Sequence, residues 1–177
     1  MKKKIVILGS TGSIGKTTIE ILKKNKNKYK IVLLTGNKNI NELIKQANFF
    51  NVKNLIVTDK KKFNLIKKRL INKKINIFND FNSFNKIFKS KIDYTMSSIS
   101  GLEGLKPTLD IIKFTKKIAI ANKESIICGW NLINKKLVKY KTTFIPVDSE
   151  HFSIWSLINN SNNNTIDEIV ITASGGP

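Results

Sequence analysis

Two carboxylates stand two positions apart near the end of the chain, where an apolar segment stops. Asp148 and Glu150 follow the run Phe144-Ile145-Pro146-Val147. If the backbone stays extended past Val147, both side chains point to one side and can share a hard divalent cation such as Mg²⁺ or Mn²⁺. The same pattern is more often a helix N-cap followed by an acidic first turn. Taken alone, it therefore favours capping over a metal site, with His151 packing at the helix start.

Two other apolar segments end in polar residues that could contact a phosphorylated ligand. Asn122-Lys123-Glu124-Ser125 follows one of them, and Ser174-Gly175-Gly176 follows the other. Lys123 beside Glu124 is either a substrate-binding cation or an ordinary surface pair, and the local pattern does not decide between them. The serine-glycine segment has the composition of a phosphate-binding turn. Because open α/β sheets bind ligands at the carboxyl ends of their strands, these segments are candidates for one site.

A glycine-rich stretch near the start of the chain offers a second kind of chemistry. Gly9-Ser10-Thr11-Gly12-Ser13-Ile14-Gly15 lies between the apolar run Ile5–Leu8 and a helical pattern from Thr17. Its G-x-x-G-x-x-G spacing is typical of a dinucleotide-binding turn of the Rossmann type with a shifted first glycine. Gly15-Lys16-Thr17 also ends like a triphosphate-binding loop, but that motif needs glycine where Ser10 stands. A tight turn without a ligand is the remaining alternative.

The second strand ends without an acidic residue, which bears on the choice of dinucleotide. Lys30–Thr35 is followed by Gly36, Asn37, Lys38 and Asn39. NAD-binding folds usually place an Asp or Glu here to hold the ribose 2′-hydroxyl. Its absence favours a 2′-phosphate, and therefore NADP over NAD. An ordinary Asn-rich turn would have the same composition.

The elements that must position these residues alternate along the chain. Hydrophobic periodicity predicts strands at 5–8, 30–35, 55–57, 75–78, 92–96, 117–121, 143–147 and 168–172. It predicts helices from about 17, and at 41–50, 60–71, 83–88, 104–114, 125–140 and 151–158. This alternation predicts an α/β fold with a doubly wound, Rossmann-type parallel sheet.

The composition excludes some classes and leaves one open. The 177 residues allow one domain, or one domain and the beginning of another. The net charge of +20 would suggest a nucleic-acid partner. However, the lysines are spread along the chain with asparagine, and Arg69 is the single arginine. We therefore expect no specific nucleic-acid partner, although polyanions should be attracted at low salt.

The apolar runs and the single cysteine bear on the compartment. The runs are too short for a membrane span, and the basic start lacks the features of a secretory signal. One cysteine, Cys128, excludes an intrachain disulfide and fits a reducing compartment. Its apolar neighbours predict a small buried core residue.

In order, these segments resemble the 1-deoxy-D-xylulose 5-phosphate reductoisomerase family. The matching pieces are GSTGSIG at 9–15, GNKN at 36–39, ANKES at 121–125, PVDSEH at 146–151 and SGGP at 174–177. The resemblance covers the whole chain but only the first part of the family pattern. One departure is Gly36-Asn37, where the family usually has Ala-Gly. Asn tolerates a left-handed turn, so we expect a small effect.

The resemblance implies a role for each matching residue. Thr11, Gly12, Ser13 and Ile14 would hold the NADPH pyrophosphate, and Gly36, Asn37, Lys38 and Asn39 the 2′-phosphate region. Asn122 and Glu124 would also contact NADPH. Asp148 and Glu150 would bind Mg²⁺ or Mn²⁺, while Lys123, Ser149, Glu150 and Ser174 would contact the sugar phosphate. Lys123 and Glu150 would be the catalytic residues.

The resemblance also implies the reaction and the domain organisation. Residues 1–147 would form the NADPH-binding domain, and 148–177 the beginning of a truncated catalytic domain. The enzyme would be a homodimer at full length, in a bacterial cytoplasm or a plastid-type organelle. It would convert 1-deoxy-D-xylulose 5-phosphate to 2-C-methyl-D-erythritol 4-phosphate in isoprenoid biosynthesis. The 177 residues alone are expected to bind NADPH without turnover. The alternatives are another NADP-dependent dehydrogenase and a non-catalytic nucleotide- or polyanion-binding domain.

Overall fold

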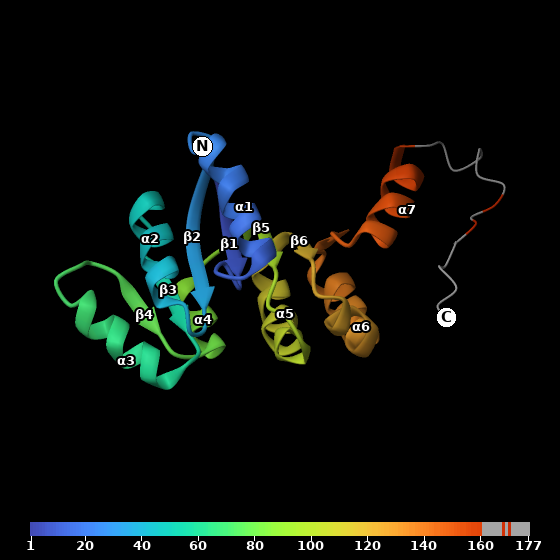
Figure 1. Ribbon diagram of the computed structural model, residues 1–177. Helices are drawn as coiled ribbons and strands as arrows, with labels where there is room; N and C mark the ends of the chain where they lie inside the picture. Colours follow the sequence, from blue (N-terminus) through green and yellow to red (C-terminus); the bar gives the residue numbers. More distant parts are fainter. Residues whose placement is uncertain (161–167, 169, 171–177) are drawn as a thin grey trace, which may run out of the picture.

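A seven-stranded parallel sheet forms the centre of the molecule, with helices on both faces (Figure 1). The computed structural model describes residues 1–160, Glu168 and Val170, except for the side chains of Glu150, Asn159 and Asn160. The strand order is β4-β3-β2-β1-β5-β6-β7, and every neighbouring pair is parallel. The doubly wound α/β architecture predicted from the sequence is therefore confirmed.

The observed bounds follow the predicted alternation closely. The strands are β1 (Lys3–Leu8), β2 (Tyr29–Gly36), β3 (Asn54–Val57), β4 (Asn76–Phe78), β5 (Ile92–Ser97), β6 (Thr115–Ile120) and β7 (Thr143–Pro146). The α-helices are α1 (Ser13–Lys24), α2 (Ile40–Phe50), α3 (Lys60–Arg69), α4 (Phe84–Ile87), α5 (Leu105–Ile111), α6 (Lys123–Tyr140) and α7 (Ser149–Asn160). Short 3₁₀ turns are η1 (Phe81–Ser83), η2 (Leu102–Gly104) and η3 (Ile112–Phe114). The strand predicted at 168–172 lies largely outside the described residues.

The two faces of the sheet are covered by different helices. Successive strand residues point to opposite faces, so in β1 the side chains of Ile5 and Ile7 join one core while Val6 and Leu8 join the other. The first core packs against α1, α2 and α3. The second packs against α4, α5 and α6. Burial on both faces explains why the central strands are nearly continuous apolar runs.

The order of the strands reverses between β1 and β5. From β1 the chain moves outward through β2, β3 and β4, and then returns to pair β5 with β1 on the other side. Leu8 at the end of β1 lies opposite Ser97 at the end of β5. Ligands of open α/β sheets bind at such a switch point, outside the carboxyl ends of the strands.

One sequence expectation was wrong. Cys128 was predicted to be a buried core residue, but it is exposed on α6. The buried residues of this helix recur every fourth position at Ser125, Gly129, Ile133 and Leu137. Cys128 precedes Gly129 and therefore points to another side of the helix. Its apolar neighbour Ile127 is likewise exposed.

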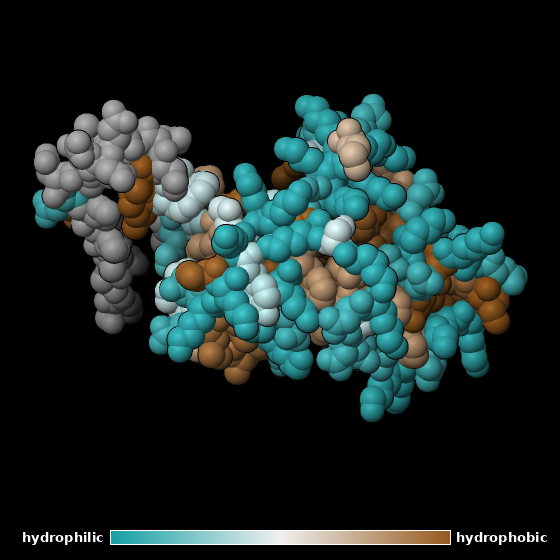
Figure 2. Space-filling view, turned by 180° about the vertical axis from the view of Figure 1, so that it is seen from behind, coloured by the Kyte–Doolittle hydropathy of each residue, from teal (hydrophilic) through white to brown (hydrophobic). Residues whose placement is uncertain are grey.

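One face of the molecule is largely hydrophilic (Figure 2). Figure 2 shows hydrophilic residues distributed over one face, interrupted by separate hydrophobic patches. Among the described residues, no helix is both long enough and apolar enough to cross a bilayer.

Candidate cofactor and metal site

A cleft of about 620 Å³ lies at the carboxyl ends of β1, β2 and β5, which is the switch point of the sheet. It contains five of the predicted cofactor-binding residues, namely Thr11, Gly12, Gly36, Asn37 and Lys38. The other lining residues are Gly9, Thr35, Thr58, Asp59, Phe81, Ser98, Ile99, Ser100 and Glu103. The structure thus brings the glycine-rich turn and the turn after β2 into one cavity.

The glycines of the first turn have different physical roles. Gly9 has φ +80°, and a Cβ atom there would lie 2.7 Å from the carbonyl oxygen of Ser98. A Cβ atom on Gly15 would lie 2.6 Å from the Cα atom of Ser10. The nearest atom to a Cβ on Gly12 would be 3.5 Å away, which is ordinary contact. Packing therefore requires glycine at 9 and 15, whereas Gly12 keeps the backbone open on the cleft side.

The N-terminus of α1 faces this cleft without a capping side chain. Gly12 is the N-cap residue and makes no side-chain capping bond, and the first turn contains no acidic residue. Ser13 and Ile14 are exposed there. The first N–H groups of a helix lack intrahelical partners and carry partial positive charge. This end of α1 therefore has the donors and the potential that suit a phosphate group.

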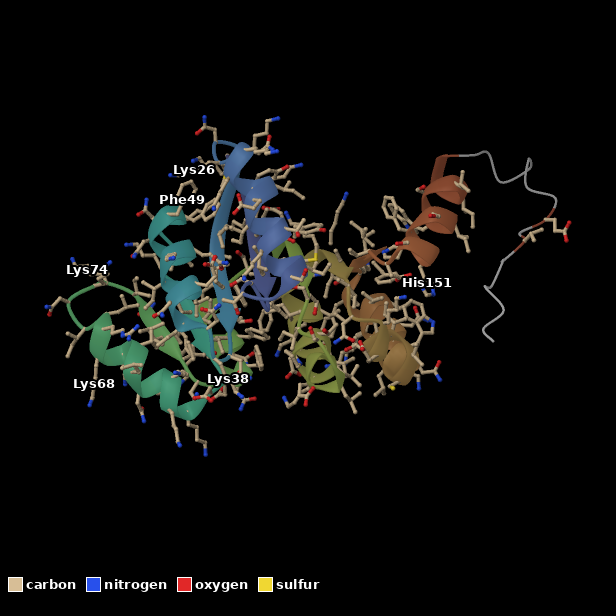
Figure 3. The ribbon with its side chains drawn as sticks, in the orientation of Figure 1. Lys26, Lys38, Phe49, Lys68, Lys74 and His151 are labelled. Carbon is tan, nitrogen blue, oxygen red and sulfur yellow. The ribbon has the colours of Figure 1, made fainter. Side chains whose placement is uncertain are left out.

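The turn after β2 presents a cation and no acid. Asn37 and Lys38 are exposed, and Lys38 lies at the opposite end of the sheet from Lys26 (Figure 3). Asn39 has a structural task, because its Oδ1 atom accepts the Glu42 N–H at 3.1 Å and caps α2. Asp59, the acid of the neighbouring strand end, accepts the Lys62 N–H at 2.8 Å and caps α3.

The Asn122 side chain, which was predicted to contact the cofactor, is bonded to backbone groups of the protein. The side chain is buried, with Oδ1 accepting the Ser125 N–H at 2.8 Å at the start of α6. Its Nδ2 atom donates to the carbonyl oxygens of Ile99 and of Gly101, the latter at 2.6 Å. Asn122 thereby fastens the loop after β5 to the first turn of α6. Lys123 and Glu124, the next two predicted residues, are exposed in that turn.

Two residues that position the cleft were not predicted from the sequence. The Oγ1 atom of Thr35 accepts the Gly9 N–H at 2.8 Å, and the Thr35 carbonyl accepts the Ser10 N–H at 2.9 Å. Ser98 donates through its hydroxyl to the Leu8 carbonyl at 2.8 Å. In the sequence, the only sign of this role was that Thr35 and Ser98 are polar residues at the ends of buried strands. The groups to which they bond belong to another strand and its following turn, which the sequence does not reveal.

Asp148 forms an N-cap rather than continuing an extended strand. α7 begins at Ser149, so the backbone does not stay extended past Val147, and the capping role that the local pattern favoured is confirmed, while the metal-binding role stays a prediction. The Oδ1 atom of Asp148 accepts the His151 N–H at 3.0 Å and lies 2.6 Å from His151 Nδ1. Figure 3 places His151 in the first turn of α7. His151 therefore bonds to the carboxylate and does more than pack at the helix start.

The other oxygen of Asp148 has unused acceptor capacity. The side chain is only 5% exposed, and Oδ2 is buried without a hydrogen-bond partner in the described part of the chain. Burial by itself raises the pKa of Asp148, but the His151 backbone and imidazole bonds outweigh it, so the pKa lies below its usual value. An ionised, unpartnered oxygen fits a hard cation. Within the described residues, no cluster of three or more His, Cys, Asp or Glu side chains could hold a metal.

Two predicted residues cannot be placed in this geometry. Glu150 belongs to the first turn of α7, but its side chain lies outside the described part of the structure. Ser174 also falls outside the described residues. Ser149 is exposed at the first position of α7. The structure therefore brings five of the ten predicted cofactor residues into the cleft lining, leaves Ser13, Ile14, Asn39, Asn122 and Glu124 outside that lining, and leaves the predicted substrate set incomplete.

Comparisons with known proteins match the whole length of the chain. The family model described as 1-deoxy-D-xylulose 5-phosphate reductoisomerase matches residues 5–129, and the C-terminal domain model of the same enzyme matches residues 144–177. The reductoisomerase of Pelagibacter ubique is 64% identical over 99% of this chain, which is 46% of that protein. The enzyme of Wolbachia pipientis subsp. Culex pipiens is 37% identical over 99% of this chain and 45% of that protein. The chain thus spans about half the length of these curated relatives.

Solved structures give the same match. A reductoisomerase from Zymomonas mobilis in complex with NADPH aligns with a TM-score of 0.88 and 33% identity. That alignment covers 100% of this chain and 47% of the other. A reductoisomerase in complex with NADPH, fosmidomycin and magnesium aligns with a TM-score of 0.77 and 29% identity, over 84% of this chain and 37% of the other.

Proposed function

This chain belongs to the 1-deoxy-D-xylulose 5-phosphate reductoisomerase family, and from that premise we propose that its cleft binds NADPH for the reductoisomerase reaction. The observation that carries the proposal is the cleft itself. An uncapped helix N-terminus and an acid-free, lysine-bearing strand end open into one cavity at the switch point of the sheet. This combination suits a dinucleotide with a pyrophosphate and a 2′-phosphate.

The described residues divide the cofactor between two turns. Thr11, Gly12, Ser13 and Ile14 would surround the pyrophosphate, because the first N–H groups of α1 begin at Ser13. The Gly12 N–H itself donates to the Gly9 carbonyl at 3.1 Å, so Gly12 would contribute by the close approach that it allows. Gly36, Asn37 and Lys38 would hold the 2′-phosphate side, with Asn39 capping α2 beside it. Asn122 would act by fixing the wall of the site, and Glu124 would lie at its edge.

The polar end of β7 would hold the cation and the substrate. Asp148 offers a buried oxygen that has no hydrogen-bond partner among the described residues, which suits a divalent cation, and Glu150 would supply a second ligand. Lys123, Ser149, Glu150 and Ser174 would contact the sugar phosphate, with Lys123 neutralising negative charge. In the bound state, NADPH supplies the hydride and Mg²⁺ or Mn²⁺ polarises the substrate carbonyl. The protein supplies position and electrostatics.

The proposed overall reaction belongs to the full-length protein. It converts 1-deoxy-D-xylulose 5-phosphate to 2-C-methyl-D-erythritol 4-phosphate, with a carbon–carbon rearrangement before the reduction. Residues 1–147 would form the cofactor-binding domain and residues 148–177 the start of the catalytic domain. We propose that the full-length enzyme is a cytoplasmic homodimer. Sedimentation of that form would test the dimer.

The test of this function is a comparison of cofactors. The 177-residue chain is titrated with NADPH and with NADH, and nicotinamide fluorescence reports binding. We expect NADPH to bind at least tenfold more tightly, which corresponds to about 1.4 kcal/mol from contacts with the 2′-phosphate. Steady oxidation of NADPH with substrate and Mn²⁺ is not expected, because Mg²⁺-type ions demand near-octahedral coordination beyond two carboxylates. Equal affinity for both cofactors, or RNA that displaces NADPH at physiological salt, would contradict the proposal.

A further inference from the structure

We propose that Gln46 is a positioning residue for the dinucleotide site. Through the Ser10 carbonyl it holds the glycine-rich turn so that the open end of α1 faces the cofactor. The inference rests on the proposed NADPH-binding function and deepens it. Gln46 belongs to α2, not to the glycine motif, and lies outside the cleft lining.

The contact between Gln46 and the turn is direct and buried. Its Nε2 atom donates to the Ser10 carbonyl oxygen at 3.0 Å and to Glu42 Oε1, also at 3.0 Å. Gln46 is 2% exposed and Ser10 is 0% exposed. Water is therefore excluded from the bond to Ser10, so no solvent donor can replace it. Loss of the donor would therefore leave a buried carbonyl oxygen without its hydrogen bond, which destabilises the native turn.

The Gln46 side chain uses its N–H donors but not its oxygen among the described residues, which indicates that this position requires a donor. The Oε1 atom of Gln46 is buried without a hydrogen-bond partner in the described residues. An apolar side chain of similar volume would avoid this desolvation cost, yet it could not donate to Ser10. The amide is therefore best explained by its donor. Its target is the turn that carries the phosphate-binding backbone.

The same amide connects the two parts of the cleft. Glu42, its second acceptor, has its own backbone N–H bound to Asn39 Oδ1 at the end of the 36–39 turn. Ser10, its first acceptor, donates through N–H and hydroxyl to the Thr35 carbonyl. Gln46 thus links the glycine-rich turn and the 36–39 turn through a series of hydrogen bonds that runs from Thr35 through Ser10, Gln46 and Glu42 to Asn39. Removing its donor should loosen the geometry of both turns together.

Gln46→Glu is the sharpest test, because protonation restores the donor. A neutral carboxyl has one O–H group, which can donate to the Ser10 carbonyl but cannot replace both amide bonds, whereas a carboxylate would face that oxygen and the Glu42 carboxylate without any donor. Burial and the negative charge of Glu42 both favour the neutral form of the introduced carboxyl. Glu42 is the titratable side chain hydrogen-bonded at this point, and the facing segment Gly9–Gly15 carries no titratable side chain.

Binding of NADP⁺ is measured by calorimetry from pH 5.5 to 8.5. The quantity of interest is the ratio of the variant Kd to the unmodified Kd at each pH, which cancels titration of the 2′-phosphate. We expect a ratio below about 2 at pH 5.5 and about 10 at pH 8.5. The matched control is Asn48→Asp, the same chemical change on the exposed side of α2 beside Lys73. Its ratio should be flat with pH, and a merely structural defect in Gln46→Glu would not recover at acid pH.

A second variant covers the case in which Gln46→Glu does not fold at alkaline pH. Gln46→Met keeps a similar volume without a donor, and should bind about tenfold more weakly at every pH. Unmodified affinity for Gln46→Met overturns the inference alone. A ratio near 1 at every pH for Gln46→Glu beside tenfold weaker binding by Gln46→Met supports it, because a carboxyl that stays neutral keeps the donor. If the unmodified chain binds no NADP⁺ at any pH, the proposed function fails first and the inference falls with it.

Discussion

Substituting alanine at Gly9 and at Gly12 should separate the folding role of the glycine turn from its binding role. At Gly9, φ is +80°, and the left-handed region costs an L-residue about 1–2 kcal/mol. The new Cβ would also lie 2.7 Å from the Ser98 carbonyl oxygen. The backbone around Ser98 would have to shift, which strains its two hydrogen bonds to the Leu8 carbonyl. These bonds contribute about 1 kcal/mol each.

The expected total for Gly9→Ala is about 2–4 kcal/mol of unfolding free energy. For a domain of this size that lowers Tm by about 5–15 °C. Gly12 has φ −76° and ψ 176°, which any residue adopts, and its Cβ would have ordinary contacts. Gly12→Ala should therefore cost less than about 1 kcal/mol. It would instead place a methyl group on the cleft side of the backbone and weaken NADPH binding.

The assay is urea and thermal unfolding followed by circular dichroism, with NADPH titration of each folded variant. Gly9→Ala should lose stability, while Gly12→Ala should keep its stability and lose affinity. The reasoning is refuted if Gly9→Ala unfolds at the same urea concentration as the unmodified chain. It is equally refuted if Gly12→Ala is the less stable of the two.

Three further changes test other parts of the structure. Lys38 lines the cleft, and we propose that it contacts the 2′-phosphate, which NADH lacks. Lys38→Glu should therefore weaken NADPH binding at least tenfold and leave NADH binding nearly unchanged, and an equal loss for both cofactors in parallel fluorescence titrations would contradict this role. Asn122→Ala should destabilise the fold by about 2–4 kcal/mol in urea unfolding, because it removes a helix cap and two bonds to the loop after β5; a change below about 1 kcal/mol would show that the loop holds itself. Asp93→Asn tests the pH dependence of stability. The side-chain bond from Lys116 and the backbone bond from Lys4 lower the pKa of Asp93 in the folded state. The stability that Asp93 contributes is therefore present above its unfolded-state pKa and is lost as the pH falls through its folded-state pKa. The variant should be about 0.5–1 kcal/mol less stable at pH 7, because the Asp93–Lys116 pair is partly exposed to solvent. The difference should persist down to the ordinary pKa of an aspartate and shrink only below it, and a difference that stays constant until the carboxyl is fully protonated would contradict the ionic origin.

The sequence by itself determined the order of the elements and the identity of the turns. Apolar periodicity is a local property, so the alternation of strands and helices was readable from β1 to α7. The glycines at 9, 12 and 15 and the acid-free turn at 36–39 were equally local signals. They were enough to predict a Rossmann-type sheet and a dinucleotide cleft.

The tertiary structure decided which residues meet. Strand order is not encoded in any single segment, yet it places Gly9 against Ser98 and brings Gln46 to the Ser10 carbonyl. It also commits the Asn122 side chain to distant backbone groups, which no local pattern could reveal. The exposure of Cys128 follows from the rotation of α6 about its own axis, and an apolar neighbourhood alone cannot fix that angle.

At Asp148 the sequence and the tertiary structure each decide part of the outcome. The sequence predicted both a cap and a metal ligand for Asp148, because the two functions need the same side chain. The fold assigns one oxygen to the cap and leaves the other buried without a partner in the described residues. The physical reason is geometric: a helix that begins at Ser149 bonds with one carboxylate oxygen and turns the other away.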